Sequence, residues 1–187
     1  MTWNDLREDL ADYVKLKYAI GELNFAPGNV FDLGYENHFD GVIITEVIEH
    51  VAHPDDFLKQ TAKLVKPGGY IITTTPLGNY FLNKLPKFTE FNNPEIFENI
   101  QFGPNSDDHI FLLHANETKL LAEMANLELI SQEIYINFLT NGHIKTHHLL
   151  NVLPKSFVNL FEKLTFKLPE TIMLKLHNNI AVLYRKS

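Results

Sequence analysis

Two carboxylates and an imidazole lie close together in the segment Glu46-Val47-Ile48-Glu49-His50. If the chain turns helical at this point, Glu46 lies three residues before Glu49 and four before His50, so the three side chains share one face. Such a group could hold a divalent cation or act as a general base. Spacing alone also fits solvated residues of a turn before a helix, because E-x-x-E-H is only a moderately specific pattern.

The flanking elements would place this group at the edge of a sheet. Residues 39–45 are short, apolar and β-branched, which predicts a buried strand. A helix is expected from Pro54 to Lys66, with Asp55 and Asp56 in its first turn, and a strand over 70–75. Because ligands of open α/β sheets bind beyond the carboxyl ends of the strands, the group after Thr45 occupies the usual place of a site.

The remaining chain completes an α/β pattern with a mainly parallel sheet. Residues 77–115 are long, polar and aromatic without clear periodicity, which is typical of a lid or substrate loop. The other elements expected from periodicity and from Pro or Gly breaks are a helix from Thr2 to near Gly21, strands at 23–26, 127–136 and 179–185, a helix ending at Ala125, and short helices over 145–176.

Length and composition favour one globular domain, residues 1–187. The net charge of −7 argues against nucleic-acid binding, which draws on clustered Lys and Arg. There is no Cys, which excludes disulfides and thiolate metal sites and suits a cytoplasmic location. No apolar run approaches the ~20 residues needed to span a bilayer.

The combined motifs resemble class I S-adenosylmethionine-dependent methyltransferases, in particular the ubiquinone-biosynthesis O-methyltransferase group. They are F-D at 39–40, E-x-x-E-H at 46–50, K-P-G-G at 66–69 and T-T-P at 74–76. The resemblance runs from residue 20 to residue 135. It implies a Rossmann-like sheet with an antiparallel carboxyl-terminal strand, S-adenosylmethionine as cofactor, and methyl transfer to oxygen of a small hydroxylated acceptor.

The resemblance also implies site residues. In that group the two Glu and the His of the motif are associated with a divalent metal, which assigns catalytic and metal-binding roles to Glu46, Glu49 and His50. His109, after Asp108 in a downstream loop, resembles a fourth metal ligand, and the metal would be Mg²⁺, Mn²⁺ or Zn²⁺. Two further imidazoles lie nearby in the sequence, those of His53 and His114.

The cofactor side departs from the family pattern, because the sequence contains no G-x-G and only 38 residues precede Phe39. We therefore expect the glycine loop, the acid that binds the ribose and two central strands to be missing, so that the sheet is truncated at its amino end. The remaining cofactor contacts implied are Asn29 and Val30 at the adenine and Thr45 at the methionine end. Gly28-Asn29 equally fits a simple turn without a role in binding.

The gap has consequences for the sheet and for the function. The strand at 23–26 would pair directly with 42–44, stand loose or associate with another chain, and Val42, Ile44 and Ile71 would lack cover. The chain would then bind the cofactor weakly and turn over little. Two other functions stay open: a methyltransferase remnant that acts as an interaction module, and a metal-dependent hydrolase that uses the same Glu and His.

Overall fold

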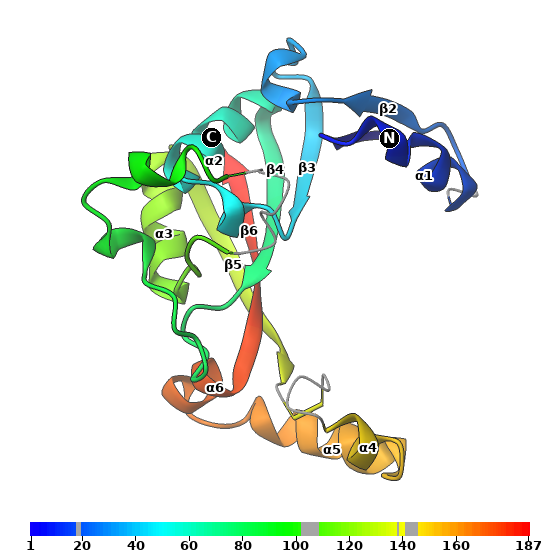
Figure 1. Cartoon of the computed structure of the whole chain (residues 1–187), viewed down its shortest axis with the longest axis vertical. Coiled ribbons are helices and arrows are strands. Elements are labelled where there is room, and N and C mark those ends of the chain that lie inside the picture. Colours follow the sequence, from blue (N-terminus) through cyan, green and yellow to red (C-terminus); the bar gives the residue numbers. More distant parts are fainter. Residues whose placement is uncertain (18–19, 102–108, 138, 141–145) are drawn as a thin grey trace.

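Four strands form the main sheet of the protein (Figure 1). A computed structural model describes residues 1–17, 20–101, 109–137, 139–140 and 146–187. The strand order is β3-β4-β6-β5. β3 is parallel to β4, and β6 is antiparallel to both β4 and β5, as the sequence predicts. The strands span Phe39–Thr45 (β3), Val65–Pro76 (β4), Leu127–Asn137 (β5) and His177–Lys186 (β6).

The crossover from β3 to β4 runs through α2, Pro54–Leu64, which confirms the predicted strand–helix–strand unit. Pro54 is the first helical residue, where its missing N–H costs no hydrogen bond. Asp55 and Asp56 lie in the first turn, as predicted, where the positive end of the helix dipole favours acids. The unit therefore fixes the carboxyl end of β3 beside that of β4.

The core lies between the main sheet and the helices α2 and α3, Ala115–Met124, which cover one face of it (Figure 1). Leu58 of α2 and Leu121 of α3 are fully buried against Ile71 and Ile180 of the sheet. Burial of this apolar surface is the main stabilising contribution to the unit that carries the site.

The amino end differs from the prediction. Thr2–Asp5 is a strand, β1, and it pairs in parallel with β2, Asn24–Pro27. Among the described residues of this end, the helical part comprises a 3₁₀ turn at Glu8–Leu10 and α1, Ala11–Lys17. Trp3 stacks on Phe25 with ring centroids 4.8 Å apart, and the Asn4 side chain donates to the Ala26 carbonyl at 2.6 Å. These contacts across the chain outweigh the local capping pattern that suggested a helix start.

A gap separates the two sheets. β2 pairs with β1 and not with β3, so β3 is an edge strand of the main sheet. The side chain of Ile43 is 71% exposed there. The expectation that Val42, Ile44 and Ile71 lack cover is wrong, because Ile44 and Ile71 are buried in the core cluster and Val42 is partly buried against it. The missing neighbour therefore exposes the edge of β3 and leaves its core face packed.

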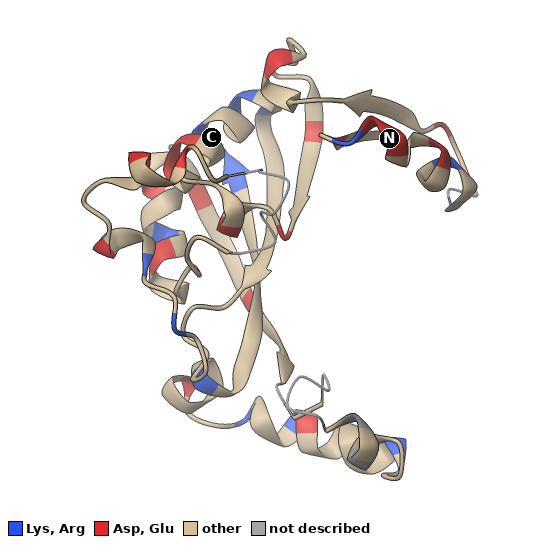
Figure 2. Cartoon of the chain, in the orientation of Figure 1, with Lys and Arg blue, Asp and Glu red and all other residues tan. Residues whose placement is uncertain are grey.

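The carboxyl-terminal helices break at Pro154 and Pro169, as the sequence predicts. They are α4 (His147–Leu150), α5 (Lys155–Thr165) and α6 (Glu170–Leu176). α4 and α5 project beyond the end of the main sheet, while acidic residues are scattered over the body (Figures 1 and 2). No helix in the described part of the chain is both long and apolar enough to cross a membrane.

Candidate functional site

The chain bends sharply where β3 ends. Glu46 has a φ of 51°, in the left-handed region that non-glycine residues rarely adopt. Its N–H donates to the Thr74 carbonyl at 2.9 Å, and its Oε1 accepts from the Thr74 hydroxyl at 3.1 Å. A 3₁₀ turn, η3 (Ile48–His50), follows in place of a helix that begins at Glu46. Glu46 therefore turns toward β4 and does not share a face with Glu49 and His50.

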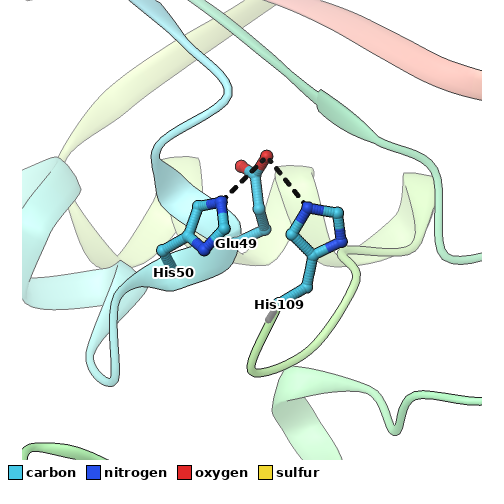
Figure 3. A group of neighbouring side chains, drawn as sticks. All are labelled: Glu49, His50 and His109. Carbon is cyan, nitrogen blue, oxygen red and sulfur yellow. Dashed lines mark ion pairs between the residues drawn. The ribbon is translucent and has the colours of Figure 1, made fainter. Parts of the chain in front are cut away.

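Glu49, His50 and His109 converge beside this bend (Figure 3). The Nε2 atoms of both imidazoles lie 4.0 Å from Glu49 Oε1, and one ligand atom from each residue lies within 4.8 Å of the others. His109 comes from the loop before α3, which is held in place because the Ile110 N–H donates to the Glu49 carbonyl at 2.9 Å. The structure thus brings together three of the four residues proposed for the metal and leaves Glu46 outside the group.

The Glu49 carboxyl group is fully buried. Its Oε2 accepts a hydrogen bond from the Thr75 hydroxyl at 3.0 Å, whereas its Oε1 has no hydrogen-bond partner among the described residues. Burial raises the pKa of Glu49 to about 7, and the charge of nearby Glu46 adds to this shift. A buried carboxylate with one free oxygen is costly, and a cation or an imidazolium at this point would offset that cost.

The donor set of one carboxylate and two imidazoles fits a transition-metal cation. Zn²⁺ and Mn²⁺ accept this mixture, whereas Mg²⁺ prefers oxygen ligands. A tetrahedral ion with bonds of ~2.1 Å needs ligand atoms roughly 3.4 Å apart. The present separations of 4.0 Å to Glu49 Oε1 would close by small side-chain rotations. Three protein ligands would leave a further position for water or for an acceptor oxygen.

The two rival imidazoles have other contacts. His53 Nε2 lies 2.9 Å from Glu98 Oε1 at the surface. His114 is the N-cap residue of α3, and burial lowers its pKa. Asp108 lies outside the described residues. Among the described downstream residues, His109 is therefore the imidazole that joins Glu49 and His50.

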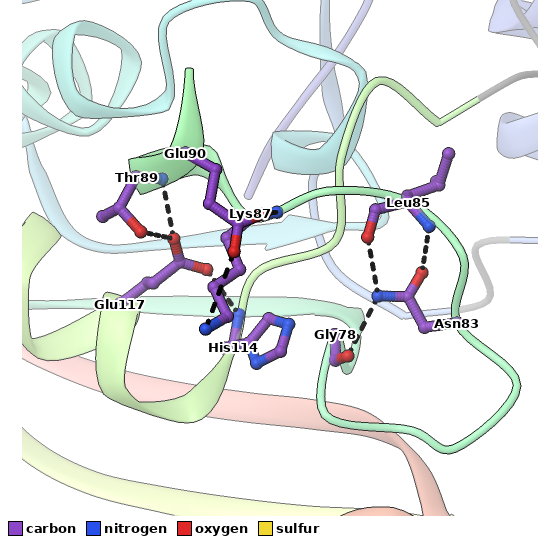
Figure 4. A network of polar contacts seen from close by, with 8 residues as sticks. All are labelled: Gly78, Asn83, Leu85, Lys87, Thr89, Glu90, His114 and Glu117. Atoms are coloured by element: carbon purple, nitrogen blue, oxygen red, sulfur yellow. Dashed lines mark hydrogen bonds and ion pairs between the residues drawn. The ribbon is translucent and has the colours of Figure 1, made fainter. Parts of the chain in front are cut away.

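Buried Glu117 anchors the segment that precedes His109 (Figure 4). Its Oε1 accepts from both the N–H and the hydroxyl of Thr89 at 2.8 Å, and its Oε2 accepts from the His114 N–H at 2.8 Å. Within the segment, the Asn83 side chain donates to the Gly78 carbonyl at 2.9 Å. We did not predict this role for Glu117. Its position three residues after the N-cap of α3, which is typical of a capping box, is the feature of the sequence that could have indicated it.

The proposed cofactor residues lie at the carboxyl ends of β2 and β3. Gly28 has a φ of +92°, and the Asn29 side chain caps the 3₁₀ turn η2 (Val30–Asp32) by accepting from the Phe31 N–H at 3.3 Å. Thr45 is the exposed last residue of β3. The structure brings Asn29 and Val30 together in one turn, and no contact joins them to Thr45 among the described residues.

The expectation that no acidic strand precedes the first helix is wrong. β1 ends in Asp5, and the Gly28 N–H donates to the Asp5 carbonyl at 2.9 Å. An acid at the carboxyl end of a parallel strand, beside a glycine turn, is where dinucleotide folds bind a ribose. Asp5 could have indicated this strand end in the sequence, but Thr2 and Asp5 also fit a capping box at a helix start.

A sequence profile described as a methyltransferase domain matches residues 3–132. The chain belongs to this methyltransferase family. The matched part begins inside β1 and ends inside β5, so it includes Asp5 and the whole Glu49–His50–His109 group. The resemblance stated from the motifs is confirmed.

Curated relatives include the ubiquinone biosynthesis O-methyltransferases of Caulobacter vibrioides and Dechloromonas aromatica. The first is 57% identical over 37 residues, 20% of this chain and 15% of the relative. The second is 32% identical over 93 residues, 48% of this chain and 37% of the relative. The matches thus span well under half of these relatives' length.

A solved structure shows the same fold. The S-adenosylmethionine-dependent methyltransferase of Archaeoglobus fulgidus aligns with 99% of this chain and 75% of its own, with a TM-score of 0.58 and 16% identity. The α/β methyltransferase sheet with its antiparallel carboxyl-terminal strand is therefore confirmed.

Proposed function

We propose that the protein transfers a methyl group from S-adenosylmethionine to an oxygen of a small hydroxylated acceptor. The observation that carries this proposal is the buried Glu49 carboxyl group, whose free Oε1 faces His50 and His109 at the carboxyl end of β3. Membership of the methyltransferase family supports the reaction type, and the names of the curated relatives support oxygen as the acceptor atom.

The chemistry asks the protein for alignment and for removal of one proton. S-adenosylmethionine, when bound, supplies a methyl group activated by the sulfonium. The acceptor hydroxyl must lie in line with it and must give up its proton. With a pKa of about 7, Glu49 is suited to accept this proton near neutral pH. Thr75 holds the carboxyl group in position through the hydrogen bond to Oε2.

We also propose that Glu49, His50 and His109 can hold a divalent cation, in which case Glu49 would be an ionised ligand and would no longer serve as the base. Such a cation would lower the pKa of the acceptor hydroxyl. Glu46 lies close enough for its charge to raise the pKa of Glu49, so it adds negative potential at the site. The strained backbone at Glu46 supports a functional role, because such conformations gather at active sites.

For the cofactor we propose contacts at the ends of three strands. Asp5 of β1 would bind the ribose, Asn29 and Val30 after β2 the adenine, and Thr45 of β3 the methionine end. Gly28 supports this arrangement, since its positive φ forms the turn that brings Asn29 beside Asp5. The sequence has no G-x-G to approach the methionine moiety closely.

We also propose a cellular and domain setting. The chain acts as one partial methyltransferase domain in the cytoplasm, and residues 77–115 form the substrate side of the site. The hydrogen bonds that join this segment to Glu117 and, through Gln101, to Ala52 support that placement. As a second function we propose an interaction module that self-associates through the free edge of β3. The exposed side chain of Ile43 on this strand favours it.

The test is transfer of labelled methyl from millimolar S-adenosylmethionine to a panel of phenols, amines and esters. We expect label on phenolic oxygen, and Glu49→Gln to reduce the rate about 100-fold by removing the base. Glu123→Gln, at an exposed position of α3 outside residues 77–115, is the matched control. Label on nitrogen or carbon, ester hydrolysis without transfer, or a rate unchanged by Glu49→Gln would contradict the proposal.

A further inference from the structure

The part of the chain that projects beyond the sheet is apolar and basic. We call residues 147–168, which include α4 and α5, the arm. Its exposed apolar side chains are those of Val152, Phe157, Leu160, Leu164, Phe166 and Leu168. The arm contains three lysines and one glutamate, in a chain whose net charge is −7 (Figure 2). The arm thus combines exposed apolar side chains with an excess of lysines over acidic residues.

The exposed apolar residues of α5 form one stripe. Phe157, Leu160 and Leu164 follow each other at three and four residues, so they lie on the same face of the helix. About half of each of these side chains is exposed. The residue facing the body, Thr165, is buried instead. Val158 and Phe161, on the same side of the helix as Thr165, are half-buried, so α5 is apolar toward the body and presents a second apolar stripe outward.

Contacts at the end of α5 hold this orientation. The Thr165 hydroxyl donates to the Glu162 carbonyl at 2.7 Å and lies 3.4 Å from His177 Nε2 of β6. The ring of Phe166 packs on that of His177 with centroids 4.6 Å apart. Glu162, the one acid of the arm, accepts from the Thr140 hydroxyl at 2.6 Å and so faces the body. The outer face is left with lysines as its charged groups among the arm residues.

We propose that the arm is a docking face for an anionic lipid surface. An amphipathic helix with phenylalanine and leucine on one side and lysines beside them lies in the headgroup region of a bilayer. Lys163 and Lys167 border the stripe and would meet lipid phosphates. A second copy fits less well, because the outer face of the arm offers no carboxylate to pair with the lysines of another copy. Charge complementarity therefore selects the lipid surface.

Flotation of the full chain with vesicles tests this proposal. We expect binding to vesicles of phosphatidylcholine with phosphatidylglycerol, weakened by salt, and at least roughly tenfold weaker binding to phosphatidylcholine alone. Leu160→Ser with Leu164→Ser should abolish binding. Lys163→Gln with Lys167→Gln should reduce it roughly tenfold or more while leaving the apolar stripe intact.

Matched controls separate the arm from general surface effects. Ile96→Ser with Ile100→Ser removes two exposed apolar side chains from the body, and Lys84→Gln with Lys119→Gln removes two exposed lysines there. Both controls should bind vesicles like the parent, and all variants should melt alike. No binding to anionic vesicles, equal loss in the controls, or a dimer in the absence of lipid that Leu160→Ser with Leu164→Ser dissociates would overturn the proposal.

Discussion

Glu49 is the residue on which the site depends, because it is an acid placed where an acid is costly. Its side chain is fully buried, one oxygen is satisfied by Thr75, and the other is left for His50 and His109. Such an arrangement reduces stability unless it serves binding or chemistry. The stability of the metal-free protein should therefore report on this one group.

We expect the free energy of unfolding to fall as the pH rises from 4.5 to 7. The pKa of Glu49 is about 7 in the folded protein against an ordinary 4.5, so the folded state binds the proton more tightly. The stabilisation is complete below 4.5 and is lost as the pH passes through 7, with a ceiling of about 3 kcal/mol. Urea titrations across this range measure it. Glu49→Gln should flatten the dependence and Glu95→Gln should not; a parallel slope in Glu49→Gln would rule out this assignment.

At the scale of single residues, the sequence was informative about identity and less so about geometry. The motif and the family resemblance pointed to Glu49, His50 and His109, which do converge. They also pointed to Glu46, which does not join them. The left-handed backbone of Glu46 depends on its hydrogen bonds with Thr74 of the next strand. No pattern in the neighbouring sequence predicts it.

The segment before His109 is positioned by α3 rather than by its own secondary structure. It contains two short 3₁₀ turns, Phe88–Glu90 and Pro94–Phe97. Glu117 at the start of α3 binds Thr89, and Gln101 Oε1 accepts from the Ala52 N–H at 3.0 Å near the end of the segment. Side-chain anchors of this kind set where the substrate side of the site lies.

Glu117→Ala should destabilise the protein by roughly 2–4 kcal/mol, because three hydrogen-bond donors from Thr89 and His114 lose their buried acceptor. Denaturant unfolding gives the free energy, and hydrogen exchange should show the Thr89 amide exchanging faster. Glu123→Ala removes an exposed glutamate of the same helix and serves as the control. Similar losses in the two variants would show that Glu117 is no anchor.

Helices and strands that are determined by residues within their own segment were predicted well, whereas β1, which depends on pairing with a distant strand, was not. α2, β4 and β6 follow from proline, glycine and apolar periodicity in their own segments. β1 was read as a helix start because Thr2 and Asp5 fit a cap, whereas its strand conformation depends on pairing with β2, about 20 residues away.

On the scale of the whole molecule, the two sheets and the edge of β3 between them determine how much of a cofactor site this chain can form. Asp5 and Thr45 are the last residues of β1 and β3, and Asn29 follows β2. The sequence has no G-x-G loop to enclose a methionine moiety. The adenosine side and the acceptor side are thus better defined than the region between them. The missing pairing partner of β3 could be predicted from the absence of a G-x-G in the sequence. The sequence did not predict that the core-facing side chains of β3 would stay buried.

We expect the 187-residue chain to bind S-adenosylmethionine weakly, with a dissociation constant well above the micromolar range. The close backbone approach that a glycine loop allows is missing, and each 1.4 kcal/mol lost weakens binding about tenfold. Calorimetric titration of the purified chain measures it. Asp5→Asn should weaken the residual binding further, while Asp12→Asn on the exposed surface of α1 should not. One-to-one binding at micromolar concentration would show that another segment replaces the loop.

The most direct test of the site is a titration of the metal-free chain with Zn²⁺ and with Mn²⁺, followed by calorimetry. We predict one cation per chain, with affinity at least roughly 100-fold lower in Glu49→Gln and in His109→Ala, because each removes one of three ligands. His53→Ala, which alters an imidazole paired with Glu98, should bind like the parent. An absence of saturable binding, or equal binding by Glu49→Gln and the parent, would contradict the cation site proposed at the carboxyl end of β3.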